Sequence, residues 1–374
     1  MIYLDYAATS PLREEALEAM LPYFKEAFGN PDSLHSCGRR AAAALQRARD
    51  AIAAALGVQP SEVYFTSGGT EADNWAARGI ARGGAAEKFL VSPVEHAAVL
   101  SAVSAHREHV VCRVGEDGVV SPDHVRDLLA ASGGVSLVGV MAVNNETGCV
   151  QPVAELAAAA HAAGAYFFSD CVQAAASCDL KELARHADAL ALSAHKVGGP
   201  KGVGALVVKK GVPIAPLIAG GEQERGLRGG TSNVAGAVGF ARALSLAQAE
   251  REAYIRHTGS LRDAFEQRIL AELGSEVRAD GARRVPNISH LTFARGGTAF
   301  LNALDLAGVA CSGGAACSSH SAQPSHVLMA MGRSAEEALR GVRFSFGRET
   351  TAEEAARAAD TVVEKYRIFS RAQA

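Results

Sequence analysis

Residues 166–196 read YFFSDCVQAAASCDLKELARHADALALSAHK and decide how the rest of the chain is interpreted. Two apolar runs, Tyr166–Ser169 and Ala189–Ser193, are typical of β-strands and flank a segment with helical spacing. A strand, a helix and a second strand in this order predict a βαβ unit with parallel strands. Asp170 follows the first run and Lys196 closely follows the second. Parallel sheets bind their ligands at the carboxyl ends of their strands, so both residues are candidates for a binding site.

Four further β-rich runs alternate with helical segments between residues 60 and 210. This alternation predicts an α/β domain in which a mostly parallel sheet is covered by helices on both faces. After about residue 233 the pattern turns helical, and it then mixes short strand-like and helical runs. We therefore expect a second, smaller α+β unit that begins inside a long helix near residue 255. The four additional runs are Val63–Thr66, Phe89–Ser92, Val135–Val143 and Gly204–Val208.

The composition is that of an ordinary globular protein and excludes several other classes. Of the 374 residues, 48% are hydrophobic and 21% are charged, a balance that argues against intrinsic disorder. The net charge of −3 implies no polybasic surface, so we expect neither nucleic acid nor an anionic membrane as a partner. No apolar run approaches the roughly 20 residues that span a bilayer, and we expect no signal peptide. Seven cysteines without a C-x-x-C pair indicate a reducing cytoplasm rather than a disulfide scaffold or a clustered metal site.

A glycine-rich turn follows the apolar run Val63–Thr66. It covers Thr66–Asn74 and reads TSGGTEADN. Gly69 lets the backbone approach a ligand, and the helix that begins there exposes N–H groups that favour an anion such as phosphate. Thr70 adds a hydroxyl to the same turn. A plain helix cap with a tight turn is the alternative interpretation, because short glycine-rich turns are weak signals.

Lys196 is unusual because burial after a strand disfavours its charge and lowers its pKa. An amine with a lowered pKa is a good nucleophile for Schiff-base chemistry, although a lysine can also extend from a strand end to solvent. Asp170 is either a ligand-binding acid or the cap of the next helix. A lysine, an acid and an anion-binding turn together fit pyridoxal phosphate (PLP). The amine binds the aldehyde, the acid keeps the pyridine nitrogen protonated, and the phosphate takes the turn.

Several motifs, in the same order along nearly the whole chain, resemble those of the cysteine desulfurases, which are PLP enzymes of the class-V aminotransferase family. The long segment after Cys317 is similar to the type that serves nitrogen fixation and general iron–sulfur cluster assembly. The resemblance implies a fold-type-I homodimer. Its large domain, residues 14–255, would carry a seven-stranded-type sheet, and its small domain would join residues 1–13 to residues 256–374. The matching motifs include Tyr3–Thr9, Phe65–Asn74, Val143–Gly148, Asp170–Gln173, Ser193–Lys196, Glu224–Thr231 and Val342–Ser345.

The resemblance also implies a role for each site residue. Lys196 would hold PLP as a Schiff base, Asp170 would pair with the pyridine nitrogen, and His96 would stack on the ring and transfer protons. Asn145 would lie near the ring hydroxyl and the substrate, whose carboxylate Arg343 would clamp with its guanidinium fork. His96 could instead be a satisfied core histidine, and Arg343 could form a strand-end ion pair. The remaining cofactor contacts would come from Gly69, Thr70, Gln173, Ser193 and His195, with Thr231 reaching the phosphate from the partner subunit.

Cys317 lies in Ser312–His326, a stretch of small and polar residues that buries little surface, so we expect a mobile loop. The resemblance implies that this thiol is the nucleophile that attacks a substrate sulfur and carries it away. A spectator thiol is the alternative. Cys311 falls on an apolar run and is expected to pack instead. Gly198 departs from the family, which usually has a large residue there.

The sequence therefore predicts a PLP-dependent cysteine desulfurase. It would convert L-cysteine to L-alanine and transfer the sulfur, as a persulfide on Cys317, to an acceptor protein. Catalysis would rest on Lys196, Cys317 and His96, with no metal ion. A selenocysteine lyase and another class-V transaminase are the nearer alternatives. A non-catalytic scaffold subunit is a more distant one, against which the joint presence of these residues with Asp170 argues.

Overall fold

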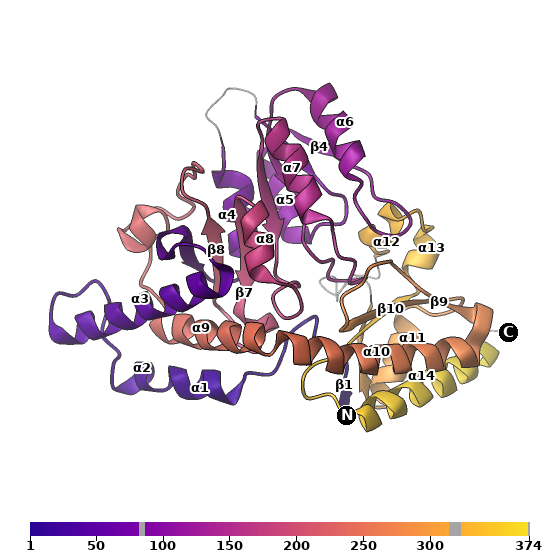
Figure 1. Cartoon of the computed structure of the whole chain (residues 1–374). Helices are drawn as coiled ribbons and strands as arrows, with labels where there is room; N and C mark the ends of the chain where they lie inside the picture. The colour runs from indigo at the N-terminus through magenta and orange to yellow at the C-terminus, as the bar shows by residue number, and fades with distance from the viewer. Residues whose placement is uncertain (82–86, 314–322, 373–374) are drawn as a thin grey trace.

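The computed structural model describes residues 1–81, 87–313 and 323–372 (Figure 1). Within these ranges a seven-stranded sheet has the strand order β2-β8-β7-β6-β5-β3-β4. Every neighbouring pair that excludes β8 is parallel, so the predicted mostly parallel α/β sheet is confirmed. The strands are β2 (Val63–Thr66), β3 (Lys88–Val91), β4 (His109–Val111), β5 (Val135–Gly139), β6 (Tyr166–Asp170), β7 (Ala189–Ser193) and β8 (Gly204–Val208).

Strand β8 is antiparallel to both of its neighbours, β7 and β2. The chain makes only a short 3₁₀ turn, Ala194–Lys196, and a glycine-rich loop between β7 and β8, with no crossover helix. A parallel connection needs a crossover of about a dozen residues or more, so this short connection returns antiparallel. The alternation of strands and helices alone does not predict this reversal.

Helices cover both faces of the large sheet. Alternate residues of each strand point to opposite faces, so Phe167 packs in one apolar core and Phe168 in the other. Helices α4 and α5 cover the face of Phe168, and the remaining helices gather on the opposite side. The large-domain helices are α1 (Glu14–Met20), α2 (Pro22–Lys25), α3 (Ser36–Leu56), α4 (Gly69–Gly79), α5 (Ala97–His106), α6 (Pro122–Ser132), α7 (Val153–Ala162), α8 (Leu180–His186) and α9 (Val234–Ala249).

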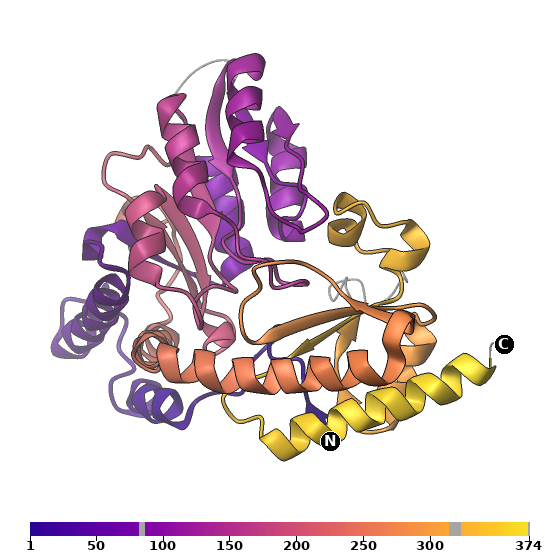
Figure 2. The same ribbon diagram turned by 45° about the vertical axis from the view of Figure 1, so that its right-hand side comes forward.

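A second, smaller sheet has the order β12-β13-β10-β9 and is antiparallel throughout. Figure 2 shows the long helices α10 and α14 running along this unit. Its core also takes in Ile2 and Leu4 from the start of the chain. Its elements are α10 (Arg251–Leu273), β9 (Val277–Ala279), β10 (Ile288–Phe293), α11 (Thr298–Leu306), β11 (Val309–Ala310), β12 (Ser312–Gly313), α12 (His326–Ala330), α13 (Ala335–Ala338), β13 (Gly341–Ser345) and α14 (Ala352–Ala372).

The N-terminal segment connects the two units. Strand β1 (Ile2–Tyr3) pairs in parallel with β11, whereas Ala7 and Ala16 pack in the core of the large sheet. Helix α9 ends at Ala249 and α10 begins at Arg251, so the chain bends between them at Glu250. The division into residues 14–255 and the rest stays a prediction. Within the described ranges, no helix is both long and apolar enough to cross a membrane.

Candidate active site

A cavity of about 370 Å³ lies at the carboxyl ends of the large sheet, in the size range of small-molecule and cofactor sites. It brings together almost all of the predicted site residues. Thr231 is exposed and does not line this cavity of its own chain. Cys317, and with it most of the predicted mobile loop, lies outside the described residues. The predicted residues that line the cavity are Gly69, Thr70, His96, Asn145, Asp170, Gln173, Ser193, His195, Lys196 and Arg343.

The turn at the N-terminus of α4 forms one end of the cavity. Its N-cap residue, Gly68, provides no side-chain cap, so the helix presents backbone N–H groups to a ligand. A Cβ atom at Gly69 would lie 2.8 Å from Cγ2 of Val172, so only glycine fits there. Glu71, in the same turn, accepts two hydrogen bonds from the Arg228 guanidinium, at 2.8 and 3.0 Å. This ion pair offsets a negative charge that would otherwise repel an anion at the turn.

Buried carboxyl groups lie at the middle of the cavity. Asp170, at the end of β6, is 4% exposed and accepts a hydrogen bond from the Val172 N–H at 2.8 Å. Burial raises its pKa, although His96 and Lys196 act in the opposite direction. Asp73 of α4 also lines the cavity, and within the described part of the chain its buried Oδ1 atom has no hydrogen-bond partner. Burial first, and then Asp170 and Glu95, raise the pKa of Asp73.

The Lys196 amine is held by the N-terminal segment of the chain. Its Nζ donates hydrogen bonds to the carbonyl oxygens of Ala7 at 2.5 Å and Ala8 at 2.9 Å. The amide of Gln173 also donates to the Ala7 carbonyl, at 2.7 Å. The Ala7 N–H in turn donates to Oγ of Ser345 in β13. The sequence placed this segment in a matching motif but assigned it no role, because alanine side chains carry no chemical signal.

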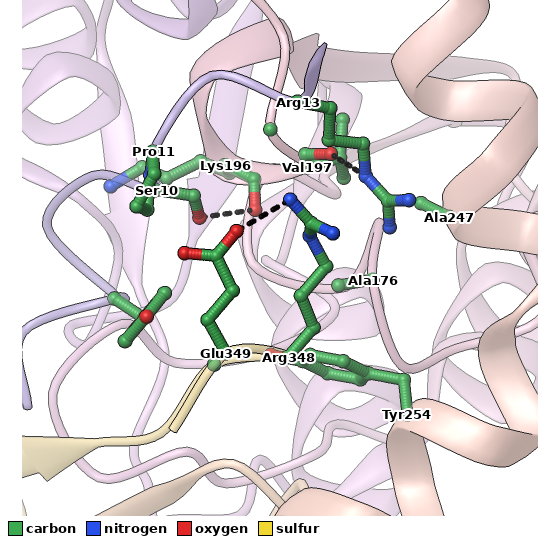
Figure 3. A pocket seen from close by; sticks show the side chains of 13 residues that line it. Ser10, Pro11, Arg13, Ala176, Lys196, Val197, Ala247, Tyr254, Arg348 and Glu349 are labelled. Atoms are coloured by element: carbon green, nitrogen blue, oxygen red, sulfur yellow. Dashed lines mark hydrogen bonds and ion pairs between the residues drawn. The ribbon is translucent and has the colours of Figure 1, made fainter. Parts of the chain in front are cut away.

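A second cavity lies behind the turn that carries Lys196 (Figure 3). The Lys196 carbonyl oxygen accepts a hydrogen bond from Ser10 at 3.2 Å, and the Val197 carbonyl accepts one from Nε of Arg13 at 3.2 Å. At Gly198, φ is +80° and a Cβ atom would lie 2.6 Å from Cγ of Arg13. The glycine at this position, where the family usually has a large residue, therefore makes room for Arg13. These contacts support the lysine turn from the side opposite its amine.

The two histidines are oriented by different contacts. Nδ1 of His96 accepts a hydrogen bond from the Ala98 N–H at 3.2 Å, so a neutral His96 carries its proton on Nε2. His195 lies beside Thr9, with 3.1 Å between Nδ1 and the threonine hydroxyl oxygen. Burial, Lys196 and Lys201 lower the pKa of His195 to about 4. His195 is therefore neutral at neutral pH and can only donate one ring N–H to an anion.

Arg343 enters the cavity from β13 and is 1% exposed. Its Nη1 donates to the Asn145 carbonyl oxygen at 2.6 Å, and its Nη2 donates to Oδ1 of Asp5 at 2.8 Å. Its buried Nε has no hydrogen-bond partner among the residues that the structure describes. A buried guanidinium with an unused donor at the edge of a ligand cavity suits a carboxylate. Asp5 was not predicted as a site residue, because its partner is 338 residues away in the chain.

The residues that line the first cavity, at the carboxyl ends of the large sheet, fit PLP. An uncapped helix N-terminus faces the same cavity as a buried acid and a lysine held at a strand end, which are the groups that bind its phosphate, pyridine nitrogen and aldehyde. Cys311, by contrast, packs against the small-domain core, and burial raises the pKa of its thiol to about 12. It is therefore a poor nucleophile at neutral pH.

Comparisons with known proteins agree with this geometry. The family described as aminotransferase class-V matches residues 2–357. "Cysteine desulfurase IscS" of Dictyoglomus turgidum is 41% identical, over 99% of this chain and 96% of that protein. A "Cysteine desulfurase" of Cereibacter sphaeroides is 46% identical, over 94% of this chain and 92% of that protein.

Solved structures show the same fold. A "NIFS-LIKE PROTEIN" superposes with a TM-score of 0.90 at 33% identity, covering 98% of this chain and 99% of the other. A NifS-like protein from Rickettsia africae superposes with a TM-score of 0.88 at 29% identity, with the same coverage. The predicted fold type, family and cofactor are thereby confirmed. The chain belongs to the aminotransferase class-V family, among its PLP-dependent cysteine desulfurases.

Proposed function

We propose that this chain converts L-cysteine to L-alanine and keeps the sulfur as a persulfide on Cys317, for transfer to an acceptor protein. One observation carries the proposal: a single cavity joins Lys196, Asp170 and His96 of the large domain to Arg343 of the small domain. The first three suit the cofactor, and Arg343 suits a substrate carboxylate.

Bound PLP supplies an electron sink for bonds at the α-carbon of the substrate. The α4 N-terminus, Ser193 and His195 bind its phosphate in this proposal, and Asp170 holds the proton on its pyridine nitrogen. The raised pKa of Asp170 in the protein alone reflects burial that the Val172 N–H, His96 and Lys196 offset only in part, a cost that a protonated pyridine would reduce further. The pKa of Asp73, which lines the same cavity, is raised as well, so its carboxyl favours the neutral form.

Two groups are placed to move protons. The Nζ atom of Lys196 is oriented by the Ala7 and Ala8 carbonyls and can accept a proton from the substrate once it is neutral. The His96 ring, whose Nδ1 is occupied by a backbone N–H, can pass a proton only through Nε2. Arg343 orients the substrate by its carboxylate.

The sulfur step balances without an added oxidant. The Cys317 thiol and L-cysteine give L-alanine and a Cys317 persulfide, so one carbon–sulfur bond breaks and one sulfur–sulfur bond forms. The thiolate is the attacking species, and a free thiol of pKa ~8.5 is only partly ionised at neutral pH. A proton acceptor near the substrate, such as His96, therefore assists this step.

A homodimer with a shared site is part of the same proposal. Thr231 is exposed and lies outside its own cavity, which supports a contact with the phosphate in a partner subunit. Large apolar side chains on and around α2 are exposed by 55–90%, which supports an interface there. They are Leu21, Phe24, Phe28 and Leu34. The sulfur-acceptor protein and the cytoplasmic location also stay predictions.

The test compares substrates on the PLP-loaded protein. Equal amounts of alanine and sulfur released from L-cysteine with a thiol reductant are expected, and a Cys317→Ser variant should release almost none. The matched control Cys311→Ser should behave as the parent protein does. Alanine release from selenocysteine alone would favour a selenocysteine lyase. Exchange of amino groups with a keto acid in the absence of Cys317 would favour a transaminase.

A further inference from the structure

The segment that carries Cys317 begins at a hydrogen-bonded contact with Arg343. Ser312 of β12 pairs with Arg343 of β13, so the two strands are held side by side. The Ser312 hydroxyl donates to Oδ2 of Asp5 at 2.9 Å. The other carboxylate oxygen of Asp5 accepts the hydrogen bond from Nη2 of Arg343 at 2.8 Å. Asp5 therefore bridges the start of this segment to the buried arginine.

The segment also ends next to Arg343. The hydroxyl of Ser325, the N-cap of α12, accepts a hydrogen bond from the Leu328 N–H at 3.2 Å. Its own proton is directed to Oε2 of Glu146, 2.5 Å away. Glu146 directly follows Asn145, whose carbonyl oxygen accepts the hydrogen bond from Nη1 of Arg343. Both Ser325 and Glu146 are at most 2% exposed.

Glu146 is a firmly held acceptor. Oδ1 of Asn144 accepts hydrogen bonds from the N–H groups of Glu146 at 3.0 Å and Thr147 at 2.9 Å. The Asn144 amide in turn donates to the Val94 carbonyl at 2.9 Å. The residue after Ser325 makes a second contact with the large domain. Nε2 of His326 lies 3.0 Å from the Glu95 carbonyl oxygen. The start of α12 is thus docked on the large domain by two adjacent polar contacts.

A buried glutamate whose carboxylate has one side-chain donor among the described residues is an expensive structural element. Burial raises the pKa of Glu146, and the Ser325 hydroxyl is the first interaction that opposes this effect. A hydrophobic residue would fill the same space at lower cost if only packing were needed. The acceptor instead fixes the position of one particular serine.

We propose that Asp5 and Glu146 are positioning residues for sulfur transfer, which tie the two ends of the Cys317 segment to the arginine that binds the substrate carboxylate. This inference rests on the proposed function. Fixing both ends of a tether raises the effective concentration of the group that it carries. The reach of the thiol is then set by one chain of contacts that also includes the arginine at the substrate carboxylate. That chain runs through Ser312, Asp5, Arg343, Asn145, Glu146 and Ser325.

The test uses Glu146→Ala with Glu146→Gln as its conservative partner, since the amide oxygen of glutamine still accepts from Ser325. In a single turnover with L-cysteine, Glu146→Ala should form the Cys317 persulfide about tenfold more slowly, whereas Glu146→Gln should stay within about threefold of the parent protein. The affinity for PLP, and that for L-alanine as a carboxylate without sulfur, should not change. Hydrogen exchange of residues 325–331 in the PLP-free protein should accelerate in Glu146→Ala alone.

Ser325→Ala adds a matched comparison, because Ser334 makes the same kind of N-cap contact with Glu337 on α13, away from the cavity. Ser325→Ala should slow persulfide formation, and Ser334→Ala should not. Equal rates in these two variants, or a loss of PLP affinity that accounts for the whole effect of Glu146→Ala, would overturn the inference. Absence of a persulfide on Cys317 in the parent protein would overturn the proposed function instead.

Discussion

The two sides of the active-site cavity are built in different ways. On the cofactor side, Asp170 ends strand β6 and Lys196 lies in the turn after the neighbouring strand β7, so one sheet positions the backbone of both. The Lys196 amine is then oriented by the Ala7 and Ala8 carbonyls of the N-terminal segment. On the substrate side, Arg343 is held by Asp5 and by the Asn145 carbonyl, which are 338 and 198 residues away in the chain. The backbone of the first side is positioned by the strand order of one sheet, whereas the second side depends on how the two units pack.

This difference separates the effects expected from substitutions. A change on the cofactor side should affect every step and alter the absorbance of bound PLP. A change on the substrate side should leave that absorbance intact and weaken the use of cysteine.

The largest effect is expected for Lys196→Ala. Alanine production should fall by at least about 10³-fold, because the amine both links the cofactor and moves the substrate proton. Lys201→Ala is the matched control, since Lys201 is an exposed lysine on the loop after the same turn. Comparable losses in both variants would mean that the loop, and not the Lys196 amine, matters.

A smaller loss, about 10²-fold in kcat, is expected for Asp170→Asn. A neutral amide cannot hold the pyridine nitrogen protonated, so the electron sink is weaker. Asp73→Asn should cost little, because the Asp73 carboxyl is already favoured in its neutral form. Steady-state alanine assays and PLP absorbance would check both, and the reverse order of effects would exchange the roles of the two acids.

On the substrate side, Arg343→Lys should raise KM for L-cysteine and lower kcat/KM by about 10- to 100-fold, because the charge remains and the bidentate fork is lost. The absorbance and affinity of PLP should stay unchanged. Arg340→Lys, at a partly exposed position just before β13, is the control. A change in PLP absorbance for Arg343→Lys would show that the two sides of the cavity are not separable.

The smallest effect concerns stability rather than turnover. Burial raises the pKa of Glu95 to about 8, so the folded protein retains a proton that the unfolded chain loses from about pH 4.5 upward. The stability of the PLP-free protein should therefore fall as pH rises between these values. Glu95→Gln should reduce this loss, by on the order of a few kcal/mol at pH 8. Urea unfolding between pH 5 and pH 8 measures the free energy of unfolding of both proteins. If this free energy changed with pH in the same way in both, the role of Glu95 would be contradicted.

Sequence patterns predict the cofactor side well. The runs Val63–Thr66, Ala189–Ser193 and Gly204–Val208 coincide with β2, β7 and β8, because apolar strands between helices have a clear periodicity. The direction of β8 was not predictable from alternation, since it depends on the length of one connection. Residue types after strand ends also indicated Asp170 and Lys196 correctly as neighbours in one cavity.

Sequence patterns do not predict the contacts between the two units. Asp5, Glu146 and the carbonyls of Ala7 and Ala8 were missed, because a carboxylate in a loop and a backbone oxygen look the same in any sequence. Their roles depend on partners that only the packing of the N-terminal segment and β13 brings near. The sequence did hold a signal for Asp73, which is an acid buried on a helix that starts at a glycine-rich turn.

The most direct measurement of sulfur transfer is to identify the residue that carries sulfur after one turnover. The PLP-loaded protein is mixed with L-cysteine without reductant, blocked with an alkylating reagent, digested and examined by mass spectrometry. One additional sulfur atom is expected on the peptide with Cys317, in an amount equal to the alanine formed, and none on Cys311. Alanine formed without sulfur on Cys317, or equal sulfur in a Cys317→Ser variant, would contradict transfer through this thiol.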